Sequence, residues 1–428
     1  MDLRAAKLRE ARSIPSKRSL RGLDWFIFFV ADVQTGFGPF ISVYLTAQAW
    51  TQVDIGLVLT IGGLVGLIGQ MPGGAIVDAA RYETVVAGIA IAAISVSALA
   101  YAAWPIFPVI LAAAVLHAGA SCVLGPSIAA ISLGLVGHHR ISERLGRNAR
   151  FASIGNGLAA AVMGAIGYFV SNRAVFLVTA GLLGPALLAL SQIRNREIDF
   201  KKAHGGEPEP AHHTPVATLL RSAPGRALIV FAACILLFQL ANAAMLPLMA
   251  SVVTMRSRDW ATVLIAACIV VPQLGVALIS PWVGRRAQEW GRRPLILMGF
   301  AALPLRGLLF ATLPGPYLLV AAQMLDGISA AVLGIMGPLV VADLTRGTGR
   351  FNLGQGIIGT AVGIGASLST TLAGYMSDHL GNEAAFLGLA AVAAAGLALV
   401  FAFMPETRPV DDEDDPPRLA PPVSSFAE

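Results

Sequence analysis

The stretch YETVVAGIAIAAISVSALAYAAW, residues 82–104, contains a single charged side chain, Glu83. A helix needs about 20 mostly apolar residues to cross the hydrocarbon core of a bilayer, so this stretch predicts a transmembrane helix. Similar stretches recur along the chain of 428 residues, of which 56% are hydrophobic and 13% are charged. The mean hydropathy is +0.72. These values exclude a soluble enzyme, a disordered protein and a disulfide-rich scaffold, and they indicate a polytopic membrane protein.

Breaks that contain polar residues, Pro or Gly divide the apolar stretches into twelve predicted membrane-spanning helices. We expect these helices at residues 22–47, 53–79, 82–104, 105–137, 143–170, 173–194, 225–254, 258–287, 292–313, 316–345, 350–380 and 382–404. The 45 Gly and 25 Pro are spread along the chain. Both residues are frequent in membrane helices, where small side chains let helices pack closely.

The basic residues are distributed unequally between the two sides of such a bundle. With the N-terminus on one side, 26 of the 30 Lys and Arg fall on that side and three, Arg173, Arg256 and Arg258, fall on the other. Cytoplasmic loops carry the excess of basic residues, so we predict that both termini are cytoplasmic. The expected location is a bacterial inner or plasma membrane. We attribute the net charge of +5 to basic residues that set the orientation of the protein in the membrane, and not to nucleic-acid binding.

The central stretch 195–224 is the one long polar connection, and it reads as a linker between two halves. The predicted organisation is a cytoplasmic tail, a six-helix bundle, a cytoplasmic linker, a second six-helix bundle and an acidic cytoplasmic tail, at 1–21, 22–194, 195–224, 225–404 and 405–428. The linker histidines suggest either a metal site or a solvated linker, and the second reading is favoured. These histidines are His204, His212 and His213.

The two halves resemble each other at a shift near 209 residues. Leu116-His117 corresponds to Leu325-Asp326, and Gly66 corresponds to Gly275. Repeated halves around a site at the membrane midplane are the architecture of secondary transporters.

Two connections carry a family resemblance. The eighth connection reads GRRAQEWGRR at 284–293 and the second reads GAIVDAAR at 74–81. They resemble the loop signature GxxxDxxGRR of the major facilitator superfamily, with Gln288 in place of the acid. The resemblance implies an all-α polytopic membrane protein of twelve transmembrane helices in two pseudo-symmetric six-helix bundles. It also implies a cytoplasmic gate formed by Asp78, Arg81, Arg292 and Arg293.

An ordinary charged helix end is the alternative reading of Asp78. Physically, an acid at a helix end can meet an Arg or the positive N-terminus of another helix. Two other acids near span ends, Asp24 and Asp343, are expected to pair with nearby arginines such as Arg21 and Arg346. The fourth-helix Arg of the family is absent, because Ala114 and Gln323 occupy the matching positions. That departure weakens a multidrug-exporter assignment and leaves the fold unaffected.

Four ionisable residues fall near the middle of predicted spans, where charge is costly and is usually functional. Asp32, His117 and Asp326 are candidates for proton coupling, because the resemblance places their helices around the central cavity. A structural buried acid or a hydrogen-bonded neutral His is the alternative. Arg306 is expected to pair with Asp326, and a snorkelling Arg or a misjudged span is the alternative. A permanent pair would weaken the case for Asp326 as a proton carrier.

Polar side chains beside Gly and Pro in the first and seventh spans are candidates for solute contact, since amides both donate and accept. These are Gln34 and Asn242, with Tyr44, Gln70 and Gln273 as further substrate-cavity candidates. The alternative is hydrogen bonding between helices.

The sequence therefore predicts a secondary active transporter that moves a small solute by alternating access. Proton coupling is expected, and export is slightly favoured over uptake by a proton-coupled permease. A non-transporting membrane sensor or scaffold is the alternative of another class. The chain contains no Walker A, dinucleotide-binding or HExxH motif in a suitable place, so it is predicted not to be an enzyme. Expected partners are the solute, protons and the lipid bilayer, with no nucleic acid, no metal and no cofactor, and a monomer is expected.

Overall fold

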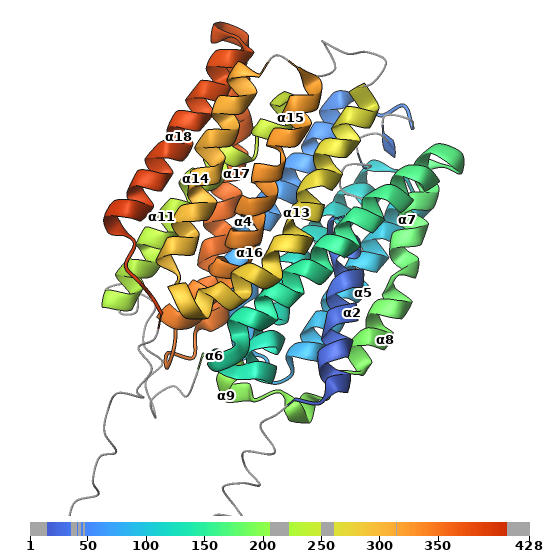
Figure 1. Ribbon diagram of the computed structural model, residues 1–428. Helices are drawn as coiled ribbons and strands as arrows, with labels where there is room; N and C mark the ends of the chain where they lie inside the picture. Colours follow the sequence, from blue (N-terminus) through green and yellow to red (C-terminus); the bar gives the residue numbers. More distant parts are fainter. Residues whose placement is uncertain are drawn as a thin grey trace, which may run out of the picture.

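The computed structural model describes residues 15–35, 41, 44–45, 48–205, 222–249, 261–313 and 315–408. Within these ranges the chain forms helices joined by short connections, and no strand is present among them. Long helices run side by side through the molecule (Figure 1).

The described residues of the first half form seven α-helices, the last of them short, and a 3₁₀ turn. The first six α-helices are α2 (Lys17–Thr35), α4 (Gln52–Ala79), α5 (Glu83–Ala103), α6 (Phe107–Phe169), α7 (Asn172–Gly181) and α8 (Leu183–Ser191). The 3₁₀ turn is η1 (Asn195–Glu197), and the short helix is α9 (Phe200–Ala203).

The second half consists of seven described helices. They are α11 (Ala223–Asn242), α13 (Ala261–Trp290), α14 (Arg293–Thr312), α15 (Pro316–Ala322), α16 (Met324–Leu344), α17 (Phe351–Leu380) and α18 (Asn382–Phe403).

The helix boundaries follow the local sequence. Hydroxyl N-caps begin three helices: Thr51 accepts the Asp54 N–H, Ser171 the Ala174 N–H and Ser222 the Gly225 N–H. Gly137 has φ 68° and ψ 175° inside α6, a conformation that favours glycine. The break predicted there is therefore a sharp change of direction between the fourth and fifth predicted spans.

Among the described residues, nine helical stretches are long and apolar enough to cross a membrane. One of them is α6, which contains both the fourth and the fifth predicted spans. The first and eighth predicted spans are occupied by α2 and α13.

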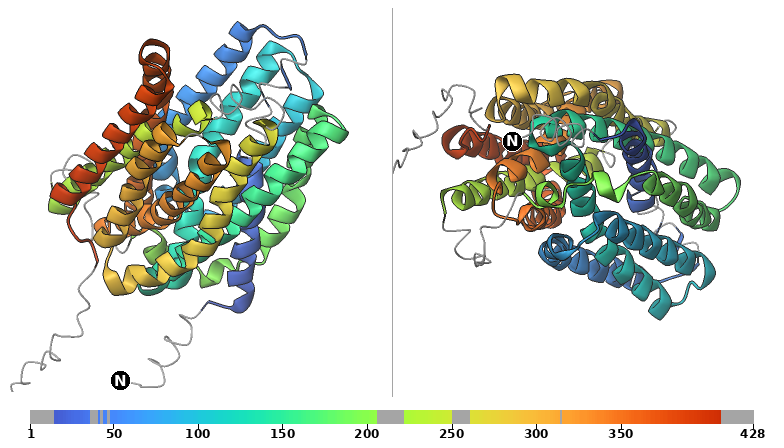
Figure 2. Two further views of the ribbon diagram at one scale, coloured as in Figure 1. Left: turned by 45° about the horizontal axis from the view of Figure 1, so that its top comes forward. Right: turned by 90° about the horizontal axis from the view of Figure 1, so that it is seen from below.

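Each half has its own packing scheme. In the first half α2, α4 and α5 pack on α6, and in the second half α14 packs on α18, α11 on α17 and α13 on α16. The halves meet where α4 packs on α17 and where α6 packs on α13. Seen from below, the blue-to-green helices of the first half lie mainly to the right of the orange and red helices of the second (Figure 2). These two helix pairs form the seam between the halves.

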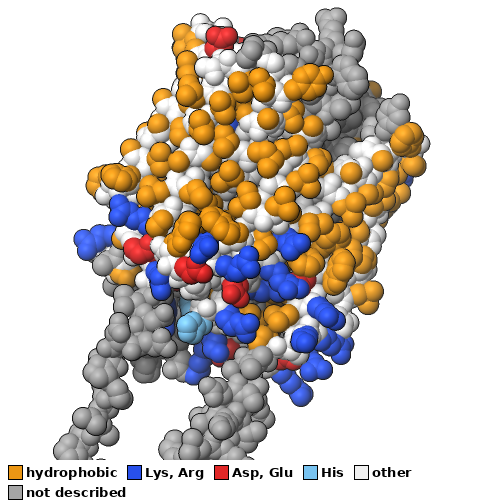
Figure 3. All heavy atoms as spheres, in the orientation of Figure 1, with side chains coloured by type: hydrophobic (Ala, Val, Ile, Leu, Met, Phe, Trp, Pro, Cys, Tyr) orange, Lys and Arg blue, Asp and Glu red, His pale blue; other side chains and the backbone are white. Residues whose placement is uncertain are grey.

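Side-chain chemistry divides the face shown in Figure 3 into two zones. Hydrophobic side chains cover the upper part of the face in Figure 3, while Lys and Arg gather in its lower part. We call this lower part the basic end. It carries the α13–α14 and α16–α17 connections and the start of α2 (Figure 1). The α4–α5 connection and the break at Gly137 lie against the η1–α9 segment at the same end.

Candidate functional site

The candidate site begins at the seam between α4 and α17, near the basic end. A Cβ at Gly74 would collide with the carbonyl oxygen of Asn352, and a Cβ at Gly356 would lie 2.5 Å from the carbonyl oxygen of Gln70. Glycine at these positions lets the two backbones touch, as small residues do at helix interfaces in membranes. The close approach brings the end of α4 against the first turn of α17.

Asp78, in the last turn of α4, caps α17 across this seam. Its Oδ1 accepts the backbone N–H of Asn352 at 3.1 Å and the Asn352 side-chain amide at 2.8 Å, and its Oδ2 accepts the Leu353 N–H at 2.8 Å. The residue before α17, Arg350, provides no side-chain cap. An acid of one half therefore satisfies the free N–H groups and the positive end of a helix in the other half.

The seam between α6 and α13 repeats this geometry. A Cβ at Gly146 would lie 2.7 Å from the Ser280 carbonyl oxygen, and a Cβ at Gly284 would lie 2.6 Å from the Ser142 carbonyl oxygen. Gln288 Nε2 donates to Ser142 Oγ at 2.8 Å and to the His139 carbonyl at 3.2 Å.

A shift of 210 residues relates the two seams. It takes Gly74 to Gly284, Asp78 to Gln288 and Ser142 to Asn352. The two seams are thus repeat-related contacts, one made by a carboxylate and one by a neutral amide.

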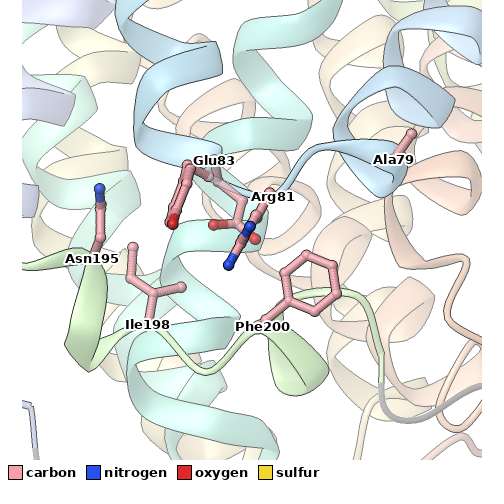
Figure 4. A pocket seen from close by; sticks show the side chains of 7 residues that line it. Ala79, Arg81, Glu83, Asn195, Ile198 and Phe200 are labelled. Carbon is pink, nitrogen blue, oxygen red and sulfur yellow. The ribbon is translucent and has the colours of Figure 1, made fainter.

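Each of the other three gate candidates makes its contacts within its own half. Arg81 lies over the Tyr82 ring at 5.6 Å and lines an open pocket of about 550 Å³ between the α4–α5 connection and the η1–α9 segment (Figure 4). Arg292 is buried and its Nε donates to Asp343 Oδ2 at 2.9 Å. Arg293 donates to the Phe401 carbonyl at 2.6 Å. Of the four candidates, the structure brings only Asp78 across the seam.

The expected partners of Asp24 and Asp343 are wrong. Asp24 is buried against α6 and pairs with Arg144 at 2.6 Å and Arg147 at 2.5 Å, because Arg21 lies on the exposed face of α2. Asp343 pairs with Arg292, while Arg346 is exposed in the following turn.

The start of the linker is folded against both halves, so the expectation of a solvated linker is wrong for His204. This residue is 4% exposed, with Nδ1 2.8 Å from the Phe200 carbonyl and Nε2 3.1 Å from the Val77 carbonyl of α4. The next residue, Gly205, has φ 89°, and its carbonyl accepts the Gly347 N–H from the second half. We call residues 195–205 the strap. The other linker histidines, His212 and His213, lie outside the described residues.

The structure places a buried polar cluster in the second half around Arg306 of α14, which is 1% exposed. Arg306 NH1 forms an ion pair with Asp326 Oδ1 of α16 and donates to Gln323 Oε1 at 3.4 Å. Its NH2 donates to Asn242 Oδ1 at 2.5 Å. Its Nε is buried and has no hydrogen-bond partner among the described residues. Asn242 and Asp326 are thus joined through one guanidinium.

The structure describes the first-half candidates for proton coupling in less detail. Asp32 and Gln34 belong to the last turn of α2, and their side chains lie outside the described residues. His117 lies on α6, three turns from its start, and is half-buried.

The other cavity candidates occupy packed positions. Tyr44 is 2% exposed and its ring packs on Phe176 in the core of the first half, with centroids 5.0 Å apart. The side-chain amide of Gln70 on α4 packs against Gly359 of α17, where a Cβ would collide with it. Ser153 of α6 donates to the carbonyl and to the side-chain oxygen of Gln273, both at 2.6 Å. Gln70 and Gln273 therefore line the two seams in this conformation.

Sequence reasoning missed Asn352, Ser142, Gln323 and the packing of His204. The repeat contained a usable signal, because Asn352 and Ser142 are equivalent at the shift that relates Asp78 to Gln288. Within the described part of the chain, no group of three or more His, Cys, Asp or Glu side chains is placed to hold a metal ion.

Comparison with known proteins identifies relatives of this chain. The model of the Major Facilitator Superfamily matches residues 25–303 and 231–425. An uncharacterized MFS-type transporter of Mycobacterium tuberculosis is 41% identical over 397 residues, which are 91% of this chain and 94% of that protein. The class B tetracycline resistance protein of Escherichia coli is 26% identical over 138 residues, 32% of this chain and 34% of that protein.

Solved structures with the same fold extend the comparison. The human organic anion transporter MFSD10 has a TM-score of 0.66 at 15% identity and covers 91% of this chain and 99% of its own. The proton:xylose symporter XylE has a TM-score of 0.66 at 16% identity, with coverage of 91% and 96%. This likeness and the family match confirm the predicted fold class, in which twelve helices form two bundles.

Proposed function

This chain belongs to the major facilitator superfamily and is a multi-pass membrane transporter of that family, and from this we infer that it moves a small solute by proton-coupled alternating access. The observation that carries the proposal is the cap that Asp78 places on α17 across the seam. It gives the two halves a closed state that is held by a few polar contacts.

Alternating access requires the halves to separate without unfolding either one. The seam, as far as the structure describes it, consists of glycine contacts and of hydrogen bonds made by Asp78, by Gln288 and by the Ser153–Gln273 pair. Opening the seam costs a few hydrogen bonds, each worth about 1 kcal/mol net and more where a charge takes part. Such an energy suits a transition between two populated states. The basic end, assigned to the cytoplasm by its excess of Lys and Arg, is the side that is closed here.

Asp32 is the leading coupling acid in this proposal, with His117 as a second titratable group of the first half. Both lie inside predicted membrane spans, where an ionisable residue is usually retained for function. Asp326 forms an ion pair with Arg306, so its carboxylate is already engaged in this conformation. We assign this pair the role of a buried switch that solute or conformational change opens, with Asn242 as its neutral neighbour.

Export is favoured over uptake because three partial relatives from Escherichia coli are named as resistance proteins. Besides the two tetracycline resistance proteins, multidrug resistance protein D is 28% identical over 121 residues. Uptake by a proton-coupled permease is the competing function within transport, and XylE, a symporter, shares the fold. A sensor or scaffold without transport is the competing function of another class.

The test is solute-driven proton flux in proteoliposomes with the purified full chain. A solute panel, first screened by thermal stabilisation, is added with an internal pH dye present, and the sidedness of the response reports the direction of transport. Asp32→Asn should abolish coupled flux, whereas Asp54→Asn, a matched change at the exposed start of α4, should leave it intact. Undiminished proton-driven transport by Asp32→Asn would exclude Asp32 as the coupling acid. Solute exchange without any proton flux in the unmodified protein would exclude proton coupling.

A further inference from the structure

A groove at the seam between α6 and α13 is not used by the proposed transport mechanism. It has a volume of about 670 Å³ and lies at the basic end. Its lining residues are Glu143, Arg147, Arg150, Phe151, Ile154, Pro281 and Arg285. Because α6 belongs to the first half and α13 to the second, the groove is shared between the halves.

The groove changes from charged to apolar along the helix axes. On α6, Arg147, Arg150, Phe151 and Ile154 follow the i, i+3, i+4, i+7 spacing that places residues on one helix face. On α13, Arg285 follows Pro281 by one turn. At 1.5 Å per residue, the apolar side chains lie about one turn from the guanidinium groups, away from the basic end.

Positive charge in the groove is incompletely neutralised. Arg147 forms an ion pair with Asp24 and also lies over the Phe151 ring at 5.6 Å. Arg150 and Arg285 are exposed and form no ion pair within the described part of the chain. The single acid that lines the groove, Glu143, is likewise exposed, so the two arginines without an ion pair face one carboxylate.

The charges also lie where the halves approach most closely. Arg147 and Arg285 directly follow Gly146 and Gly284, whose contact makes the seam. Closing the seam therefore brings like charges from the two halves into one groove, and like charges repel.

Two observations place the groove at the membrane surface. Trp25 of α2 is 51% exposed and its ring contacts Phe151 edge to face, with centroids 6.2 Å apart. Trp290, at the end of α13, is 50% exposed. Exposed Trp side chains gather at the level of lipid headgroups. Figure 3 shows the same transition, from hydrophobic side chains above to Lys and Arg below.

We propose that this groove binds an anionic phospholipid, with the phosphodiester on Arg150 and Arg285 and the start of an acyl chain against Phe151 and Ile154. Guanidinium groups bind phosphate through paired, charge-assisted hydrogen bonds. Basic pockets between membrane helices on the cytoplasmic side are suited to anionic headgroups. A soluble anion would use the arginines but not the apolar wall.

The bound lipid links the two halves. By neutralising charge from both, it stabilises the conformation in which the seam is closed. This regulatory consequence rests on the proposed alternating access, whereas lipid binding itself does not.

Native mass spectrometry of the delipidated full chain tests the binding. Phosphatidylglycerol and phosphatidylcholine with identical acyl chains are titrated in turn, and phosphatidylglycerol should bind more tightly. One basic residue near an anionic lipid contributes about 1 kcal/mol, or about fivefold in affinity, so R150Q and R285Q should each weaken phosphatidylglycerol binding by about that factor. Binding of phosphatidylcholine should not change.

The control is R226Q together with R346Q, which removes two exposed arginines from the basic end outside the groove. This variant should bind phosphatidylglycerol as the unmodified chain does. Equal affinity of R150Q/R285Q and the unmodified chain would overturn the proposal. Full competition by millimolar inorganic phosphate or glycerol 3-phosphate would overturn it too, because it would show an anion site without a lipid. Loss of lipid binding with solute transport retained would reject only the regulatory consequence, leaving the proposed function standing.

Discussion

The Asp78 carboxylate on α4 accepts the backbone N–H groups of Asn352 and Leu353, the second and third residues of α17, at 3.1 and 2.8 Å. A helix N-terminus is normally capped by a residue that precedes it in the chain. Here the capping residue comes from the other half of the molecule. Separation of the halves therefore uncaps α17, so the stability of this helix end and the state of the gate are linked.

Asp78→Ala should favour the open basic end. Loss of a capping side chain costs about 0.5–2 kcal/mol, and the charge raises the value toward the upper end, so the closed population should fall about 5- to 30-fold relative to the open one. Spin labels at Tyr82 and Arg346, exposed positions in opposite halves, would report longer distances. The control is Asp54→Ala, which removes an acid from the opposite end of α4. An unchanged distance distribution in Asp78→Ala would show that the Asp78 cap on α17 does not hold the basic end closed.

Gln288→Ala should act in the same direction but more weakly. Gln288 donates to Ser142 without a formal charge, and a neutral hydrogen bond contributes about 1 kcal/mol. The same pair of spin labels should show about a fivefold loss of the closed population. Ser142→Ala removes only the bond to the hydroxyl and leaves the bond to the His139 carbonyl, so its effect should be no larger than that of Gln288→Ala, and the double change should match Gln288→Ala. A larger effect of Gln288→Ala than of Asp78→Ala would show that the repeat-related seams do not differ by charge as proposed.

The fold could be predicted from the sequence because its determinants are local and one-dimensional. Hydropathy located the spans, and Gly137 located the break inside α6. The contact between Asp78 and α17 could not be derived in this way. It depends on which helix of the second half lies opposite α4, and hydropathy contains no such information. The repeat relates Asp78 to Gln288, but it does not state that each contacts the other half.

The sequence also does not indicate which side chains surround each buried charged group. The predicted pairing of Arg306 with Asp326 rests on their depth, their opposite charge and the family resemblance, and the structure adds Gln323 and Asn242 to their surroundings. Arg21 is close to Asp24 in the sequence, but it lies on the exposed face of α2, whereas Asp24 faces Arg144 and Arg147 of α6. His204 was assigned to solvent because polar composition describes the linker as a whole, whereas its first residues fold onto α4 and α6.

Gly205→Ala should detach the strap from the second half. Gly205 has φ 89°, which an alanine adopts only with strain of about 1–2 kcal/mol, and its Cβ would lie 2.9 Å from the Thr345 carbonyl oxygen. Hydrogen exchange of residues 198–205 should then rise by about tenfold. Gly381→Ala is the matched control, since Gly381 has φ 87° and open space around its Cβ position. Equal exchange of the strap in both variants would show that the contact with Thr345 does not hold it.

Arg306 and Asp326 should show strong energetic coupling. Removing one member of a buried ion pair costs about 3–5 kcal/mol, because the remaining charge is left in an apolar interior. The partial exposure of Asp326, 26% of its side chain, lowers the cost of leaving that carboxylate without its partner, so Arg306→Ala should destabilise less than Asp326→Ala, which leaves the buried guanidinium unpaired. The double change should be less destabilising than the sum of the single changes, by at least 1 kcal/mol in a thermal unfolding cycle. Arg173→Ala, an exposed position, supplies the baseline. Additive single effects would mean that Arg306 is held by Asn242 and Gln323, and that Asp326 is free to act as a proton carrier.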